Sequence, residues 1–130
     1  MAITSDVNPK GELAIRTVAM PADTNPSGNI FGGWVVSQMD LAGGTVCRKF
    51  SCHNVVTVAI NAMEFIAPIH VGDFVCCYAE VVKTGTTSMT VNIETWALPP
   101  GSMQRHKVTE GVFVYVAVNE KFRPIPIEAK

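Results

Sequence analysis

Residues 25–44 read NPSGNIFGGWVVSQMDLAGG, and this stretch decides the fold. A loop rich in Asn, Pro and Gly leads into a Gly-Gly pair, where an apolar segment with helical spacing begins. One carboxylate, Asp40, lies about two turns inside that segment. The free N–H groups at a helix N-terminus stabilise negative charge, and a lone carboxylate in an apolar segment usually has a partner or a function. The stretch therefore predicts a helix that carries a chemical site.

The predicted helix runs from Phe31 to about Phe50 and has two distinct stripes. On a helical wheel the apolar side chains lie within roughly 80° of one another; they are Phe31, Val35, Met39, Ala42 and Val46. The opposite stripe contains only small residues apart from the carboxylate: Gly33, Ser37, Asp40 and Gly44. Another backbone or a ligand could approach such a stripe closely. We expect this helix to be buried nearly all round.

Strand-forming segments make up most of the remaining chain. We expect strands at Glu12–Met20, Val55–Phe65, Phe74–Lys83, Thr87–Leu98 and Val108–Val118. The fourth alternates clearly, with Met89, Val91 and Ile93 on one face and polar residues on the other. The fifth is almost continuously apolar, which is typical of a strand covered on both faces.

One long helix and about five strands predict an α+β fold, in which an antiparallel sheet curls around a central helix. A sheet of that size covers only one side of the helix. The other side and the sheet edges need cover from another copy of the chain. We therefore expect a homodimer, and a single domain over residues 1–130.

Composition excludes several classes of protein. The chain has 130 residues, a net charge of −1 and 48% hydrophobic residues, which disfavours disorder and allows a core of its own. It has no basic block, so nucleic acid is not an expected partner. Residues 1–10 lack the apolar core of a signal peptide, and no apolar run is long enough to span a membrane. We expect a cytoplasmic protein.

The four cysteines, Cys47, Cys52, Cys76 and Cys77, show no spacing typical of a metal site. Neighbouring residues of a strand point to opposite faces, so Cys76 and Cys77 cannot share a metal. We expect all four to be small buried hydrophobic residues in a reducing compartment, and we expect neither a metal nor a redox cofactor.

Ordered blocks along nearly the whole chain resemble the hotdog-fold acyl-CoA thioesterases, most closely the bacterial YciA-type enzymes. The blocks read AMPADTN (19–25), IFGGW (30–34), SQMD (37–40), VTVA (56–59), FIAPI (65–69), VGD (71–73), KTG (83–85), VTEGVF (108–113) and VAV (116–118). The resemblance implies two subunits that join their sheets into one layer. It also implies active sites at the interface, and a dimer that can assemble further.

The resemblance also implies roles for particular residues. Asp40 would be the catalytic carboxylate, Gly32 and Gly33 would offer N–H groups to the thioester oxygen, and Asn25 would face Asp40 from the other subunit. Thr57 and Val58 would line the pantetheine path. The coenzyme A entrance would be flanked by Lys83, Thr84, Gly85, Thr86 and Ser88. Relatives often have a basic residue where Thr86 stands, so Lys83, or Arg105 and Lys107, would supply the positive charge. Some relatives also carry a longer helical tail than this chain.

Other interpretations of the site remain open at this stage. Asp40 could be a structural carboxylate, Asn25 a turn residue, and the Gly pair an aid to a tight turn. Ser37 lacks a nearby histidine, so a serine nucleophile is disfavoured. A hydratase of this fold would use a histidine base, and none lies between Asn25 and Phe50. A non-catalytic acyl-CoA-binding module is the main alternative to an acyl-CoA thioester hydrolase in which Asp40 is general base or nucleophile.

Overall fold

The computed structural model describes residues 8–127 and contains the helix and five strands that the sequence predicts. Their bounds differ from the predicted ones only at the ends, and a short 3-10 helix, η1, was not predicted. The elements in chain order are β1 (Glu12–Val18), η1 (Pro21–Asp23), α1 (Gly32–Ser51), β2 (Asn54–Phe65), β3 (Phe74–Thr84), β4 (Ser88–Leu98) and β5 (His106–Val118).

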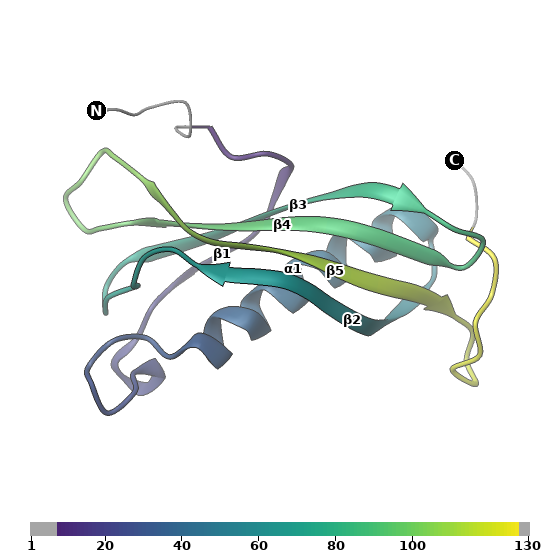
Figure 1. The fold of residues 1–130 in the computed structure, drawn as a ribbon, viewed down its shortest axis with the longest axis horizontal. Helices are drawn as coiled ribbons and strands as arrows, with labels where there is room; N and C mark the ends of the chain where they lie inside the picture. Colours follow the sequence, from purple (N-terminus) through teal and green to yellow (C-terminus); the bar gives the residue numbers. More distant parts are fainter. Residues whose placement is uncertain (1–7, 128–130) are drawn as a thin grey trace.

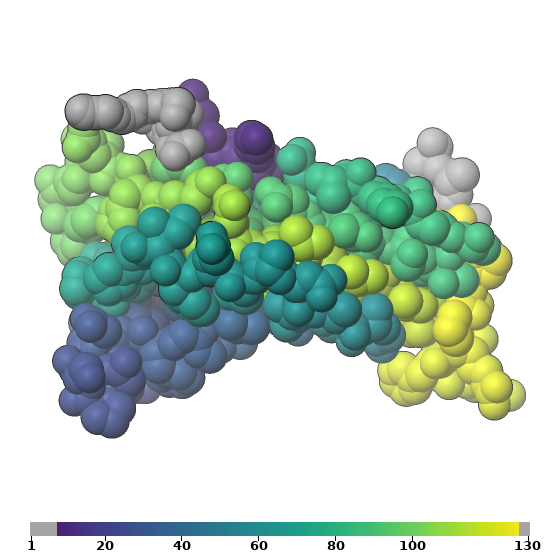
Figure 2. All heavy atoms as spheres, viewed as in Figure 1, coloured from purple at the N-terminus to yellow at the C-terminus, as the bar shows by residue number. Residues whose placement is uncertain are grey.

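The strands form one antiparallel sheet in the order β1-β3-β4-β5-β2, and α1 packs across one face of it. Figure 1 shows the helix running behind the sheet. Within the described residues, β1 and β2 are the two edges, and β2 pairs only with β5. Figure 2 shows β2 along the front of the molecule, with the loop before α1 at one end and the residues after β5 at the other. An edge strand this long has free main-chain groups to pair with another strand.

One side of α1 faces the sheet and is buried, whereas the other is open in this single chain. Val35, Met39, Ala42 and Val46 are buried, as predicted, but Phe31 is 42% exposed. On the opposite side Ser37, Leu41 and Thr45 are exposed. The expectation that the helix is buried all round is therefore wrong for one chain, because one sheet covers only one face of a helix.

The prediction that β5 is covered on both faces is also wrong for one chain. Phe113, Tyr115 and Ala117 point to the helix and are buried, whereas Val112, Val114 and Val116 on the other face are only partly buried. The apolar outer face of β5 has no layer above it within the described residues. Such a face is stabilised when a second molecule covers it.

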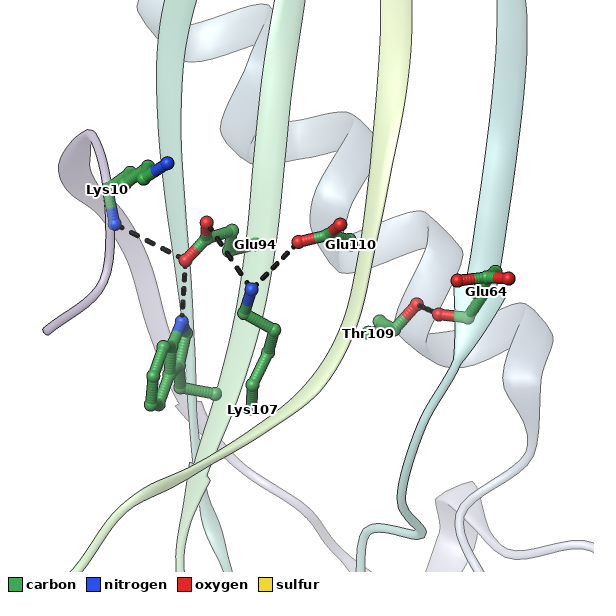
Figure 3. A network of polar contacts seen from close by, with 7 residues as sticks. Lys10, Glu64, Glu94, Lys107, Thr109 and Glu110 are labelled. Atoms are coloured by element: carbon green, nitrogen blue, oxygen red, sulfur yellow. Dashed lines mark hydrogen bonds and ion pairs between the residues drawn. The ribbon is translucent and has the colours of Figure 1, made fainter. Parts of the chain in front are cut away.

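The outer face of the sheet carries one buried carboxylate that the alternating pattern of β4 did not predict to be buried. Glu94 is 3% exposed. Its Oε1 accepts hydrogen bonds from the indole of Trp96 at 2.9 Å and from the backbone N–H of Lys10 at 3.3 Å. Lys107 lies 3.7 Å from Oε2 and also pairs with Glu110. Figure 3 shows this network on the face of the sheet away from α1. The paired charge explains why a carboxylate is tolerated there.

Three of the four cysteines are buried, as predicted, and all four are free thiols. Cys52 is the exception: it is exposed because it ends α1, with a left-handed φ of 64° and its N–H bonded to the carbonyl of Arg48. Within residues 8–127, no group of three or more His, Cys, Asp or Glu side chains is arranged to hold a metal ion. No helix in the described part of the chain has the length and apolar character needed to cross a membrane.

Candidate active site

The Asp40 carboxylate is held by two hydroxyl groups from two strands. Thr57 Oγ1 on β2 donates a hydrogen bond to Asp40 Oδ1 at 2.6 Å. Tyr115 on β5 donates from its hydroxyl to the same oxygen and to the main-chain carbonyl of Asp40, both at 3.0 Å. Asp40 itself is partly exposed, whereas Tyr115 is 1% exposed. The carboxylate therefore lies at the border between the core and the open side of α1.

The register of β2 and β5 explains why both hydroxyls reach the same oxygen. Thr57 and Tyr115 are direct partners across the two strands, so their side chains lie on the same face of the sheet. The register shifts directly afterwards, since Ala59 pairs with Val114 and Val58 is the extra residue of a β-bulge. Bulges redirect side chains, and Val58 is 55% exposed at the sheet edge.

Gly43, one turn after Asp40, makes room for Tyr115. A β-carbon built on Gly43 would lie 2.7 Å from Ile93 Cδ1 and 2.8 Å from Tyr115 Cε1, and nearer still to the hydroxyl oxygen. Contacts this short do not occur between real side chains, so any larger residue would displace the phenol ring. The packing of Tyr115 against α1 therefore requires a glycine at position 43.

Burial raises the pKa of Tyr115 well above its usual value, and the nearby charge of Asp40 raises this pKa further. The phenol is therefore neutral at any physiological pH. It acts as a permanent hydrogen-bond donor to Asp40.

The start of α1 offers free N–H groups between two aromatic rings. The helix begins at Gly32, Phe31 gives no side-chain cap, and no acidic residue stands in the first turn. The ring of Phe65 lies against Gly32 and the ring of Phe31 against Gly33. Uncapped N–H groups beside apolar surface are suited to bind a negatively charged oxygen.

Within one chain this helix start and Asp40 are too far apart to act on the same atom. Gly33 precedes Asp40 by seven residues, which corresponds to about 10 Å along a helix axis. A thioester carbon in contact with Asp40 would therefore not have its oxygen at the Gly32 and Gly33 N–H groups of the same chain.

Asn25 organises its own loop and keeps two donors free. Its Oδ1 accepts hydrogen bonds from the backbone N–H groups of Ser27 at 2.9 Å and Asn29 at 3.2 Å. This is the turn geometry expected of Asn before Pro. The loop uses the acceptor of this side chain, and within the described residues it leaves the amide N–H groups for another partner.

The β3–β4 turn lies level, across the strands of the sheet, with the two residues that bind Asp40, Thr57 and Tyr115. Met89 pairs with Thr84 on one side and with Tyr115 on the other. Thr57 and Thr84 are thus three strand spacings apart, about 14 Å. Lys83, Thr84, Gly85 and Thr86 are exposed, and Ser88 folds back against Gly85, whose N–H bonds to the Ser88 carbonyl at 2.9 Å.

Arg105 and Lys107 lie at the other end of the sheet and on its outer face. Both contact the ring of Trp96, and Trp96 pairs with Cys76 on β3. Cys76 precedes Thr84 by eight residues, which is about 26 Å along a strand. Within one chain, Lys83 is therefore the predicted cation that stands at the β3–β4 turn.

Two clefts lie in the described part of the chain, and neither of them lies over Asp40. One, of about 730 Å³, lies where α1 ends and includes Arg48, Lys49 and His53 among its lining residues. The other, of about 520 Å³, lies on the outer face beside Glu94. Asp40 lines neither of them. The carboxylate thus faces an open surface in the single chain.

The sequence analysis missed Tyr115, whereas it placed Met39 correctly on the buried stripe of the helix. Met39 is fully buried in the core, whereas Phe31 and Phe65 are exposed near the helix start. A tyrosine in an apolar strand was the one available signal for Tyr115, because a buried phenol hydroxyl needs a polar partner. The sequence could not show that this partner is Asp40.

Comparison with known proteins agrees with the fold. Residues 27–103 match the family model described as the thioesterase superfamily. The acyl-CoA thioester hydrolase YciA of Salmonella typhimurium is 51% identical over 130 residues, covering 96% of this chain and 98% of that protein.

Solved structures agree equally well. The hexameric thioesterase of Yersinia pestis has a TM-score of 0.90 and 47% identity, with 94% of this chain and 100% of that chain covered. A hexameric hotdog-fold thioesterase of Campylobacter jejuni has a TM-score of 0.85 and 41% identity, with 91% of each chain covered. The chain therefore belongs to the hotdog-fold acyl-CoA thioesterases of the thioesterase superfamily. As a member of that family it is an acyl-CoA thioester hydrolase, as the sequence analysis expected.

Proposed function

We propose that the protein hydrolyses acyl-CoA to a free carboxylic acid and coenzyme A, with Asp40 as the catalytic carboxylate. The observation that carries this proposal is the arrangement of Asp40 itself. It is the one acidic side chain of α1, it faces the open side of the chain, and two hydroxyl groups hold one of its oxygens. A carboxylate fixed in this way beside an accessible surface is suited to act on a substrate.

Two routes through the same carboxylate remain part of the proposal. As a general base, Asp40 takes a proton from water while the water oxygen attacks the thioester carbon. As a nucleophile, it attacks that carbon itself, and water then hydrolyses the resulting anhydride. In both routes the C–S bond breaks, and the coenzyme A thiolate leaves and takes up a proton.

The Gly32 and Gly33 N–H groups are proposed to stabilise the negative charge that develops on the thioester oxygen. Such a donor contributes about 3–4 kcal/mol to transition-state stability in enzymes where one has been removed. The apolar rings of Phe31 and Phe65 flank these groups. Apolar neighbours lower the local dielectric constant, which strengthens the interaction.

Each active site is proposed to be shared between two subunits. Asp40 and the start of α1 are about 10 Å apart along their own helix, and the side of α1 that bears Asp40 is uncovered in one chain. A second subunit would bring its helix start, and the free amide N–H groups of its Asn25, to the Asp40 of the first. The relatives from Yersinia pestis and Campylobacter jejuni are described as hexameric. A dimer that assembles into a hexamer is the corresponding proposal for this chain.

Coenzyme A is proposed to extend from Asp40 along Thr57 and Val58 towards the β3–β4 turn. Lys83 would supply a cation there, with Thr84, Gly85, Thr86 and Ser88 offering polar groups. The proposed chemistry needs only water and the acyl-CoA, with no metal or redox cofactor. The four free thiols suit a reducing compartment, which supports a cytoplasmic location.

The direct test is Asp40→Asn, which removes the negative charge and keeps the shape of the side chain. Hydrolysis of a panel of acyl-CoA substrates should fall by at least about 100-fold for every chain length, in line with the loss of a positioned base. The melting temperature and oligomer size should stay close to those of the parent. Ser37→Ala, on the same open side of α1, is the matched control and should keep its rate.

The panel also separates the enzyme from the alternative of a non-catalytic binding module. A parent protein that binds coenzyme A in calorimetry but hydrolyses none of the substrates would favour that module. An Asp40→Asn variant within about threefold of the parent rate would remove Asp40 from the mechanism, because that loss is far smaller than a general base supplies.

A further inference from the structure

Tyr115 has no part in the reaction proposed above, yet its hydroxyl contacts the reacting residue twice. We propose that Tyr115 is a positioning residue that fixes the Asp40 carboxylate, so that Oδ1 is the held oxygen and Oδ2 the reacting one. This inference rests on the proposed catalytic role of Asp40 and names the atom of that side chain which meets the substrate.

The two oxygens of the Asp40 carboxylate differ in the hydrogen bonds that they accept. Oδ1 accepts from Thr57 at 2.6 Å and from Tyr115 at 3.0 Å. Among residues 8–127 no hydrogen bond to Oδ2 is formed. An oxygen that already accepts two donors is a weaker base and nucleophile than one with free lone pairs. Oδ2 is therefore the oxygen able to take a proton from water or to attack the thioester.

The second contact of Tyr115 sets the orientation of the side chain. The hydroxyl oxygen of Tyr115 lies 3.0 Å from both the main-chain carbonyl oxygen and Oδ1 of Asp40, so its single proton is shared between these two acceptors. The phenol therefore links the carboxylate to the backbone of its own residue, which restricts rotation about the side-chain bonds. Catalytic groups act well only when held within about 0.5 Å of the productive geometry.

Gly43 is part of the same arrangement, because Tyr115 reaches Asp40 only across a position without a β-carbon. A β-carbon there would lie 2.8 Å from Tyr115 Cε1 and 2.7 Å from Ile93 Cδ1. Ile93 and Tyr115 are both buried, so the two side chains that this β-carbon would meet lie in the core. Gly43→Ala would consequently displace the hydroxyl without removing it.

The charges around Asp40 favour a role for Tyr115 as a donor and exclude proton transfer by the phenol. Burial and the charge of Asp40 raise the pKa of Tyr115. The neighbouring Cys47 on α1 is also neutral, because burial raises the pKa of its thiol to about 12. Thr57 on β2 carries no charge, and the contact from β4 is the apolar Ile93. The groups that contact this cluster from α1, β2 and β4 are thus uncharged.

The experiment compares Tyr115→Phe with the parent enzyme, as the intact oligomer, in kcat and KM from about pH 4 to pH 9. The lost bond is one to a charged group, so kcat should fall by at least about tenfold while KM changes by less than about twofold. The acid limb of the kcat profile should move to higher pH, because the charged carboxylate loses a donor that favours it. Tyr78→Phe is the matched control, since the Tyr78 hydroxyl contacts Arg105 away from the site.

Gly43→Ala gives a second, independent measurement with the phenol still present. It should lower kcat and shift the acid limb in the same direction. The double variant with Tyr115→Phe should lose less activity than the product of the two single losses, because both changes act on one hydrogen bond.

The outcomes separate this inference from the function on which it rests. A Tyr115→Phe enzyme with the parent kcat, while Asp40→Asn is inactive, overturns the positioning role alone. A lower kcat with an unmoved acid limb indicates a packing role and also overturns it. An Asp40→Asn enzyme with the parent rate overturns the proposed function together with this inference.

Discussion

The ring of Phe65, the last residue of β2, lies across Gly32, the first residue of α1. A β-carbon built on Gly32 would stand 3.2 Å from Phe65 Cζ, so a larger residue would have to push the ring aside. Phe65 is 53% exposed, which leaves much of the ring facing outward beside the helix start. The structure thus places an apolar wall next to the N–H groups proposed to bind the thioester oxygen.

Phe65→Ala should change the choice of acyl chain more than the overall rate. Removing the wall lengthens the space beside Gly32, and one methylene in an apolar pocket is worth about 1–3 kcal/mol. The ratio of kcat/KM for long over short acyl-CoA substrates should therefore rise by at least about fivefold. Phe122→Ala, which removes an exposed ring in the segment after β5, is the control. An unchanged ratio would place the acyl chain elsewhere.

Mixing two inactive variants tests whether the site is shared between subunits. Asn25→Ala and Asp40→Ala should each be nearly inactive. When the two are unfolded and refolded together, about half of the dimers are mixed, and each mixed dimer has one site without a lesion. Activity should recover to roughly a quarter of the parent value, as twofold symmetry requires.

The mixed sample needs two checks. Mass spectrometry must show that heterodimers have formed, and size measurement must show a dimer or a multiple of it. No recovery despite confirmed heterodimers would mean that both residues belong to one subunit. A stable, active monomer would contradict the shared site altogether.

Glu94→Ala should destabilise the fold without acting on the proposed site. The substitution leaves the indole N–H of Trp96 without its partner and removes the charge opposite Lys107. Removing one partner of a buried polar pair costs about 1–3 kcal/mol. Urea unfolding should show this loss, whereas Glu80→Ala in the same outer cleft should be close to neutral. Equal stabilities of the two variants would show that the network adds nothing.

Stability should fall at alkaline pH because two of the three buried thiols keep their protons to a higher pH in the folded chain than in the unfolded chain. Burial raises the pKa of Cys47 from 9.0 to about 12 and that of Cys77 to about 11. Above pH 9 the unfolded chain therefore releases protons that the folded chain retains, and the free energy of unfolding decreases. The decrease continues until the pH exceeds the pKa values of these two thiols in the folded chain.

Unfolding in urea between about pH 7 and pH 11 measures this effect, with the slope fixed by the difference in bound protons. Cys47→Ala should give a shallower decline above pH 9 than the parent. Cys52→Ala is the control, since Cys52 is exposed. Parallel declines in all three proteins would assign the alkaline loss to other groups.

Much of the fold follows from local patterns. The apolar spacing of residues 31–50 can only be satisfied by a helix, and the alternation around Met89, Val91 and Ile93 by a strand with one buried face. Turn-forming residues at 68–73 and 84–86 lie at the connections between β2 and β3 and between β3 and β4. These signals depend on neighbours a few positions apart, and all of the predicted elements are present in the structure.

What surrounds each residue was decided by the tertiary structure alone. The sequence singled out Asp40 because a lone carboxylate in an apolar helix is unusual, but its partners come from β2 and β5, at separations of 17 and 75 residues. Their meeting depends on the register that places Thr57 opposite Tyr115, and on the space at Gly43. Glu94 shows the same dependence, since its burial requires Trp96 and Lys107 to fold over it. Periodicity tells which way a side chain points, whereas long-range strand pairing decides what it meets there.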